Sequence, residues 1–388
     1  MFERPQRGNR AVLVVLDTGD GDHAHRQSEL SALAASAGAE VAGTVTGRGT
    51  RPDPATFARR GKVEEIDALR RATGADLVIF DHALSGVQQR NLEQRLECRV
   101  VDRTSLILDI FALRARSAEG KLQVELAQLA HLATRLAGGW THLERQKGGI
   151  GLRGPGETQL ETDRRLIGAR VKLLRGRIAR VARSRAVQSR TRRRADVRTV
   201  AIVGYTNAGK TTLFNRLTGA AAYAADQLFA TLDTTLRRVY APGAAPIVLS
   251  DTVGFIRDLP HDLVAAFRST LTEAADADLV LHVIDASSPE RDEQIAAVDA
   301  VLAEIGAAEV PQIRVLNKVD LADLPPGVER DGCGTISTVR LSAATGAGCA
   351  DLKSALAERF PAPALAGPAA EVRDPASRDQ ESTPSQSA

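Results

Sequence analysis

The chain has 388 residues, 43% of them hydrophobic, and a formal net charge of only +3, a composition typical of a globular protein with two or three domains. Its apolar runs stay below the ~18 residues of a membrane-spanning helix, so we expect neither a membrane span nor, from its polar start, a signal peptide. Cys98, Cys333 and Cys349 lie far apart without metal-ligand spacing, which indicates reduced thiols and a cytoplasmic protein.

The first 105 residues alternate between strand-like and helix-like segments. Strand patterns cover 12–16, 41–45, 77–80 and 99–101, and helical patterns cover 28–37, 63–72 and 87–96. This alternation predicts a small parallel α/β domain, which we place at residues 1–112. Because no G-x-G-x-x-G motif follows a strand there, we interpret the domain as a binding module and not as a dinucleotide site.

Residues 113–196 are predicted to form a long antiparallel helical hairpin. Apolar residues recur at helical spacing in two stretches, at Leu122, Leu126, Leu129, Ala133 and Leu136, then at Ile167, Val171, Leu174, Ile178 and Val181. Such stripes favour two helices that pack against each other. The capping-box pattern at 158–161 predicts that the second helix begins there.

A glycine-rich segment at 138–156 joins the two helices, with seven glycines among nineteen residues. Loops of this length are functional or disordered more often than not. Arg145, Lys147 and Arg153 give this loop cations that could approach RNA closely, and a floppy linker is the alternative.

Positive charge is concentrated in the second helix. Residues 164–198 contain fourteen Lys and Arg and a single acidic residue, Asp196, so the rest of the chain carries about ten net negative charges. This asymmetry is typical of a nucleic-acid-binding surface. We take Arg164, Arg165 and Arg175 as further candidate RNA contacts, with a solvated helix face as the alternative.

Residues 204–211 match the full phosphate-loop pattern G-x-x-x-x-G-K-[ST], between an apolar run at 200–203 and a helical segment at 213–217. In such loops backbone amides cradle phosphates, a lysine bridges the β- and γ-phosphates, and a hydroxyl binds Mg²⁺. Those roles fall to Lys210 and Thr211, and a turn without ligand is the alternative. Nucleotide contacts are expected from Gly204, Tyr205, Thr206, Asn207, Ala208, Gly209, Lys210, Thr211 and Thr212.

The threonine-rich stretch 227–235 occupies the position of a first switch segment. We expect nucleotide contacts from Phe229, Ala230 and Thr231, and one threonine should complete the Mg²⁺ shell. Thr231 is favoured, with Thr234 and Thr235 as alternatives, because spacing alone does not decide among them.

A D-x-x-G motif follows the strand pattern at 247–250. Asp251 would hold Mg²⁺ through water, and the amide of Gly254 would meet the γ-phosphate, which makes Lys210 and Gly254 the catalytic candidates. Thr252 and Val253 are expected beside the nucleotide. Phe255 follows where many small GTPases have glutamine, and since its ring cannot hydrogen bond, the attacking water must be positioned by other groups.

Two later motifs indicate guanine. The first contains Asn317, Lys318 and Asp320, each of which we expect to contact the nucleotide. The carboxylate of Asp320 can accept two hydrogen bonds from guanine that adenine cannot donate. A strand pattern at 339–341 leads into Ser342, Ala343 and Ala344, where a backbone amide would meet the guanine O6. These motifs complete a P-loop GTPase domain at 197–360, a parallel sheet with flanking helices, and residues 361–388 are predicted to be a disordered tail.

Asn207 occupies the position at which potassium-activated GTPases place an asparagine that helps to hold a monovalent cation. K⁺ is therefore a candidate cofactor beside Mg²⁺. A residue tolerated in a turn for its backbone preferences is an equally weighted alternative.

The chain resembles the HflX family of Obg-related translational GTPases over nearly all of residues 10–360. The motifs that carry the resemblance are RNLE at 90–93, VDRT at 101–104, LDIF at 108–111, EGKLQVELAQL at 119–129, GGIG at 148–151, RGPGE at 153–157, ETDRR at 161–165, FATLD at 229–233 and DTVGF at 251–255. Thr234 departs from the proline that many members have after the switch aspartate.

The resemblance implies a monomeric factor that binds GTP or GDP and the rRNA of the large ribosomal subunit, and that helps to split or rescue stalled ribosomes. A GTP-gated RNA-binding factor in ribosome assembly, without subunit splitting, is the alternative. A tRNA-modifying GTPase shares the Asn207 loop but would need a cofactor domain with its own catalytic cysteine, which is not evident. Some relatives also accept ATP, and the sequence does not indicate where.

Overall fold

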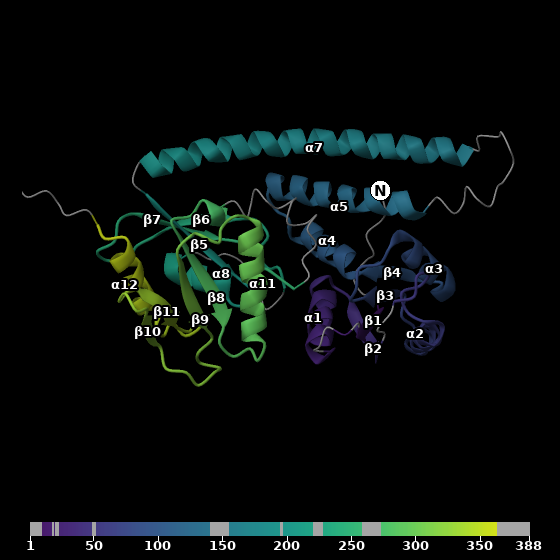
Figure 1. The fold of residues 1–388 in the computed structure, drawn as a ribbon, viewed down its shortest axis with the longest axis horizontal. Coiled ribbons are helices and arrows are strands. Elements are labelled where there is room, and N and C mark those ends of the chain that lie inside the picture. The colour runs from purple at the N-terminus through teal and green to yellow at the C-terminus, as the bar shows by residue number, and fades with distance from the viewer. Residues whose placement is uncertain are drawn as a thin grey trace, which may run out of the picture.

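The computed structural model describes residues 10–17, 19, 23–48, 52–139, 155–194, 197–219, 228–257 and 273–362. Figure 1 shows a smaller N-terminal α/β domain and a larger α/β domain side by side, with the long helix α7 (Pro155–Arg194) running above both. The two α/β domains and the long helix confirm the predicted fold class. Within the described residues, no helix is both long enough and apolar enough to cross a membrane.

The N-terminal domain is a four-stranded parallel sheet of order β2-β1-β3-β4. Its elements are β1 (Arg10–Asp17), α1 (His23–Ser36), β2 (Glu40–Arg48), α2 (Arg60–Thr73), β3 (Leu77–Phe80), α3 (Gly86–Leu96), β4 (Arg99–Asp102) and α4 (Arg103–Arg114). Every strand and helix predicted from the pattern forms. The interior of β1 is buried and almost continuously apolar, as expected for a strand covered by helices on both faces.

The larger domain, here called the G domain, has a seven-stranded sheet of order β10-β11-β9-β8-β5-β7-β6, with antiparallel pairing only at its two edges. Its elements are β5 (Arg198–Gly204), α8 (Lys210–Thr218), β6 (Thr235–Val239), β7 (Ile247–Asp251), β8 (Leu279–Asp285), α11 (Arg291–Glu304), β9 (Gln312–Asn317), β10 (Gly327–Arg330), β11 (Ile336–Arg340) and α12 (Cys349–Arg359). The predicted strand patterns at 200–203, 247–250 and 339–341 form β5, β7 and β11, whereas β6, β8 and β10 are not predicted. Because the carboxyl ends of β5, β7, β8 and β9 lie at one edge, the predicted motifs converge there.

Helices α5 (Ala118–Gly139) and α7 lie antiparallel, as Figure 1 shows, and form the predicted hairpin. The predicted start of the second helix at 158–161 is wrong, because α7 begins at Pro155. Proline suits the first helical position, where its missing N–H would have no helical partner. The predicted loop also loses both ends to the helices, and its remainder, 140–154, lies outside the described residues.

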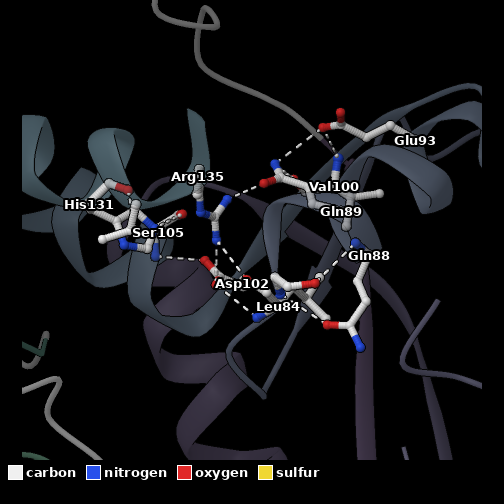
Figure 2. A network of polar contacts seen from close by, with 11 residues as sticks. Leu84, Gln88, Gln89, Glu93, Val100, Asp102, Ser105, His131 and Arg135 are labelled. Atoms are coloured by element: carbon white, nitrogen blue, oxygen red, sulfur yellow. Dashed lines mark hydrogen bonds and ion pairs between the residues drawn. The ribbon is translucent and has the colours of Figure 1, made fainter. Parts of the chain in front are cut away.

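A polar network attaches the C-terminal half of α5 to the N-terminal domain (Figure 2). Arg135 Nη2 lies 2.5 Å from Asp102 Oδ2, and Asp102 also caps α4 by accepting from Ser105 N at 2.9 Å. The ring of His131 lies 3.2 Å from Ser105 Oγ. Because Asp102 is buried, its carboxylate depends on these partners, and they fix α5 on the domain.

One hydrophobic core joins the two domains. It includes Ile107 and Phe111 of α4 together with Phe229 and Phe255 of the G domain. The rings of Phe111 and Phe229 meet edge to face with centroids 4.7 Å apart.

At the C-terminal end, Ala362 N donates to Gly243 O at 2.9 Å, so the predicted tail begins later than residue 361. Residues 363–388 lie outside the described part.

Candidate nucleotide-binding site

The phosphate loop has the backbone that its glycines require. Gly204 has φ of 149°, and a Cβ there would lie 2.1 Å from Val283 O, so only glycine fits between β5 and β8. Gly209 has φ of 90°, and its Cβ would lie 2.2 Å from Asn317 Nδ2. The chain then enters α8 at Lys210, which leaves the first helical N–H groups pointing into the loop.

A pocket forms where this loop meets the two predicted switch segments. Its lining residues are Thr206, Asn207, Gly209, Lys210, Thr211, Thr212, Phe229, Ala230, Thr231, Thr252 and Gly254. Lys210 Nζ donates to Tyr205 O at 2.6 Å, and burial lowers the pKa of Lys210 to about 8. A Cβ at Gly254 would lie 3.0 Å from that Nζ, so the two catalytic candidates face the same point.

Three oxygen-bearing side chains meet beside Lys210. Thr211 Oγ1 lies 2.6 Å from Thr231 Oγ1 and donates to Asp251 Oδ2 at 2.9 Å. Burial raises the pKa of Asp251, and within the described part of the chain its Oδ1 is buried without a hydrogen-bond partner. A carboxylate with an unsatisfied oxygen beside two hydroxyls fits a hard cation such as Mg²⁺.

Not every predicted contact points at the pocket. The hydroxyl of Tyr205 turns away and contacts Glu29 of α1, while Val253 and Ala208 are buried in the core. Phe255 is fully buried in the core that the two domains share and does not line the pocket, while its backbone pairs with Gly204 and Thr206. Asn207 is exposed in the pocket wall with φ of 61°.

The guanine-specifying motifs are linked by Asn317. Its Nδ2 donates to Ala208 O at 2.8 Å, and its Oδ1 accepts from Ala343 N at 2.9 Å, which ties the phosphate loop to the Ser342–Ala344 segment. Lys318 Nζ lies 2.7 Å from Asp285 Oδ2, and Asp320 is exposed. Ser342 and Ala343 are buried, whereas Ala344 is exposed.

Arg216 of α8 makes contacts that no sequence motif predicts. Its guanidinium donates to the carbonyls of Ala343 and Ala344, and so it supports the outer side of the same loop. No local motif signals such a role, because the partners are more than a hundred residues apart.

The candidate RNA contacts fall into two groups. Arg164, Arg165 and Arg175 are exposed on α7, and two of them, Arg164 and Arg175, border a groove between α5 and α7. Arg145, Lys147 and Arg153 lie outside the described residues.

Comparisons with known proteins agree with this geometry. Residues 24–112, 114–192 and 199–318 match family models described as GTP-binding GTPase N-terminal, GTP-binding GTPase Middle Region and 50S ribosome-binding GTPase. The chain is similar to GTPase HflX of Escherichia coli strain K12, with 58% identity over 362 residues that cover 93% of this chain and 85% of that one. It is also similar to GTPase HflX of Caldanaerobacter subterraneus, with 50% identity over 332 residues, 85% of this chain and 77% of that one.

Among solved structures, the GDP complex of SsGBP is similar in fold, with a TM-score of 0.52 at 23% identity. The match covers 92% of this chain and 98% of that chain. It therefore extends over the N-terminal domain, the hairpin and the G domain.

Proposed function

The chain belongs to the HflX family of GTPases, and we propose that its GTP cycle controls binding to the large ribosomal subunit and the splitting or rescue of stalled ribosomes. It is a P-loop GTP hydrolase. The observation that carries the proposal is that one molecule joins the phosphate pocket to an arm, α5 and α7, whose outer face is basic. All residues of the proposed site lie in one chain, so we infer a monomer. The proposed binding to ribosomes places its action in the cytoplasm.

In this proposal Thr211 and Thr231 would hold Mg²⁺ and Asp251 would hold it through water, and the ion would neutralise negative charge on the nucleotide phosphates. Lys210 donates to the same phosphates, and its charged form gains from their negative charge. The Gly254 amide donates to the γ-phosphate. Support comes from the meeting of these groups at one pocket, where preorganised donors stabilise the transition state most strongly.

We assign guanine selection to Asp320 and the backbone of the Ser342–Ala344 segment. Asp320 is exposed after β9, free to accept from the guanine edge, and Asn317 fixes the second segment beside it. Because adenine cannot donate the two hydrogen bonds that the carboxylate accepts, this arrangement favours GTP over ATP.

Sucrose-gradient sedimentation tests the function directly. Intact ribosomes incubated with the protein and a non-hydrolysable GTP analogue are expected to separate into subunits, with the protein on the large one. The Asp320→Asn protein supplies a matched control. It should split ribosomes with the xanthosine analogue and lose activity with the guanosine one, since asparagine offers a donor as well as an acceptor.

Two results would contradict the proposal. Ribosomes that stay intact while the protein binds free large subunits would favour the RNA-binding assembly factor. Equal activity of Asp320→Asn with both analogues would remove the guanine assignment and leave the splitting result in place.

A further inference from the structure

Asp233, in the first switch segment, lies at the start of helix α5. Its Oδ2 accepts hydrogen bonds from the backbone N of Arg116 at 2.9 Å and of Ser117 at 2.7 Å, and its Oδ1 accepts from Ser117 Oγ at 2.5 Å. All three donors belong to the segment that leads into the basic arm. A carboxylate is favoured at this position because helix N-termini carry partial positive charge.

The contact is so close that any side chain at Gly120 would displace the Asp233 carboxylate. A Cβ at Gly120 would lie 2.2 Å from Asp233 Oδ1, well inside van der Waals contact. The carboxylate therefore sits directly on the first turn of α5.

The same switch segment also contacts the N-terminal domain at two points. Leu228 N donates to Ser36 Oγ of α1 at 3.1 Å, and the ring of Phe229 packs on Phe111 of α4. Between these anchors and Asp233, Thr231 turns the other way and places its hydroxyl on Thr211. Thr231 thus depends on neighbours that the N-terminal domain and the arm hold.

We infer that Asp233 is a positioning residue for the GTPase reaction: through the N-terminus of α5 it holds Thr231 at the magnesium site. This inference rests on the proposed role of Thr231. It also couples the arm to the nucleotide site. The switch segment that carries Thr231 is hydrogen-bonded through Asp233 to the residues at the start of α5.

A purely structural role for Asp233, as the cap of α5, is a weaker explanation. Ser117 already caps that helix, since its Oγ accepts from Gly120 N at 2.8 Å. Two of the three groups that donate to Asp233 are backbone amides of Arg116 and Ser117, which precede the helical residues. The helix therefore has its own cap, and the additional bonds fix the switch segment.

The test compares two substitutions that break the contact from opposite sides. Asp233→Asn replaces an acceptor oxygen with a donor facing N–H groups. Gly120→Ala places a methyl group against the Asp233 carboxylate and leaves the sequence of the G domain unchanged. Alanine is otherwise favoured within a helix. Asp331→Asn is the matched control, because Asp331 accepts from Cys333 N and Thr335 N, each at 2.9 Å, in an exposed turn away from the switch.

The readout is the affinity for a fluorescent GDP and for a fluorescent non-hydrolysable GTP analogue, both titrated with Mg²⁺ present. Both contact variants should bind GDP normally and bind the GTP analogue about fivefold to tenfold more weakly, as expected for loss of charged hydrogen bonds. Hydrolysis should slow in parallel. The protein with both substitutions should bind the GTP analogue no more weakly than the single variant of lower affinity, because both substitutions remove the same contact.

Failure of this inference can be separated from failure of the magnesium assignment by Thr231→Ala. If Thr231→Ala binds the GTP analogue as well as the original protein, the proposed role of Thr231 is wrong. If Thr231→Ala is impaired but Gly120→Ala keeps the original ratio of GTP-analogue to GDP affinity, the assignment stands and the positioning role of Asp233 is refuted. A control protein, Asp331→Asn, that lost the same affinity would also refute it.

Discussion

His282, a buried residue of the central strand β8, makes stability depend on pH. Burial lowers its pKa to about 4, and the nearby cations Arg314 and Lys210 act in the same direction. Asp299 of α11 is the facing acid, but its oxygen is 3.7 Å from Nδ1 and its side chain is 46% exposed, so it compensates little. The imidazole is therefore neutral in the folded protein.

The sign of the effect follows from proton uptake. An unfolded histidine has a pKa of about 6.5, so below that pH the unfolded chain binds a proton that the folded chain does not. The contribution of His282 should be fully present above pH 6.5 and lost as pH falls toward 4, by up to about 3 kcal/mol. Urea unfolding from pH 4.5 to 7.5 should show a steeper loss for the original protein than for His282→Asn. Parallel curves would contradict this.

Asn207 tests the role of K⁺. Its positive φ of 61° explains asparagine as a turn residue, while its exposure in the phosphate pocket allows a cation contact. Glycine keeps that backbone without cost and removes the side-chain oxygen. We expect faster GTP turnover in K⁺ than in Na⁺, and Asn207→Gly should lose this preference while its GDP affinity is retained. Equal turnover in both salts for the unaltered protein, with and without ribosomes, would exclude the cation role.

At the residue scale, the sequence predicts contacts whose geometry is local. The phosphate loop is readable because its glycines and Lys210 lie within one strand-to-helix turn. Asp233 and Arg216 act on segments more than a hundred residues away, and nothing in their own neighbourhoods signals those partners. The family resemblance marks Asp233 as the switch aspartate but indicates no partner for it.

At the element scale, α7 carries the proposed RNA contact. Reversal of the exposed residues Arg164, Arg165 and Arg175 to glutamate should weaken binding to large subunits and flatten its salt dependence. Each phosphate contact contributes roughly 0.7 to 0.9 to the slope of log K against log salt, so loss of three contacts should lower that slope by about 2. Pelleting with large subunits across about 50 to 300 mM salt, a range that brackets the usual phosphate-dominated change, measures both effects.

The control for this prediction is a protein with three arginine-to-glutamate substitutions at positions away from α7. Arg59 before α2, Arg95 of α3 and Arg359 of α12 are exposed away from α7, and their reversal should leave the slope near that of the original protein. Both proteins must retain GTP affinity. Pelleting of the α7 variant equal to that of the original at every salt concentration would show that α7 is not the contact.

Periodicity explains which elements could be predicted. The apolar stripe of α5 includes Ala133, which lines the groove against α7, yet α5 also buries Val124 and Ala127 in the core shared with α4. A second buried face blurs a single-stripe pattern, so the docking of α5 on the N-terminal domain could not be predicted. The edge strand β10 is exposed and mostly polar, and gives little strand signal.

For the whole molecule, a buried ionic network joins the N-terminal domain to the phosphate loop. Arg103 Nη2 lies 2.5 Å from Glu29 Oε2, and its Nη1 lies 2.8 Å from Asp81 Oδ1. Glu29 also contacts the hydroxyl of Tyr205, which accepts from Arg257 N at 2.9 Å. Burial and the adjacent Glu29 hold the pKa of Tyr205 well above its usual range, so this hydroxyl stays protonated.

We expect the two domains to unfold together in the original protein because they share this network and one core. Arg103→Met keeps bulk but leaves the buried Glu29 without its cation and Asp81 with Arg26 alone, and the loss of one partner of a buried ion pair typically costs about 3 to 5 kcal/mol. Arg330→Met is the control, since Arg330 pairs with Glu358 at a site where both side chains are 47% exposed, and such a surface pair contributes little to stability.

Calorimetry should therefore show one transition for the original protein and for Arg330→Met, and two for Arg103→Met. The separation is expected because the network, unlike an exposed ion pair, lies across the boundary between α1, α4 and the phosphate loop. The N-terminal domain, which contains the uncompensated Glu29, should melt first, and GDP should then raise only the later transition. A single transition for Arg103→Met, displaced no further than that of Arg330→Met, would show that the apolar core alone couples the domains.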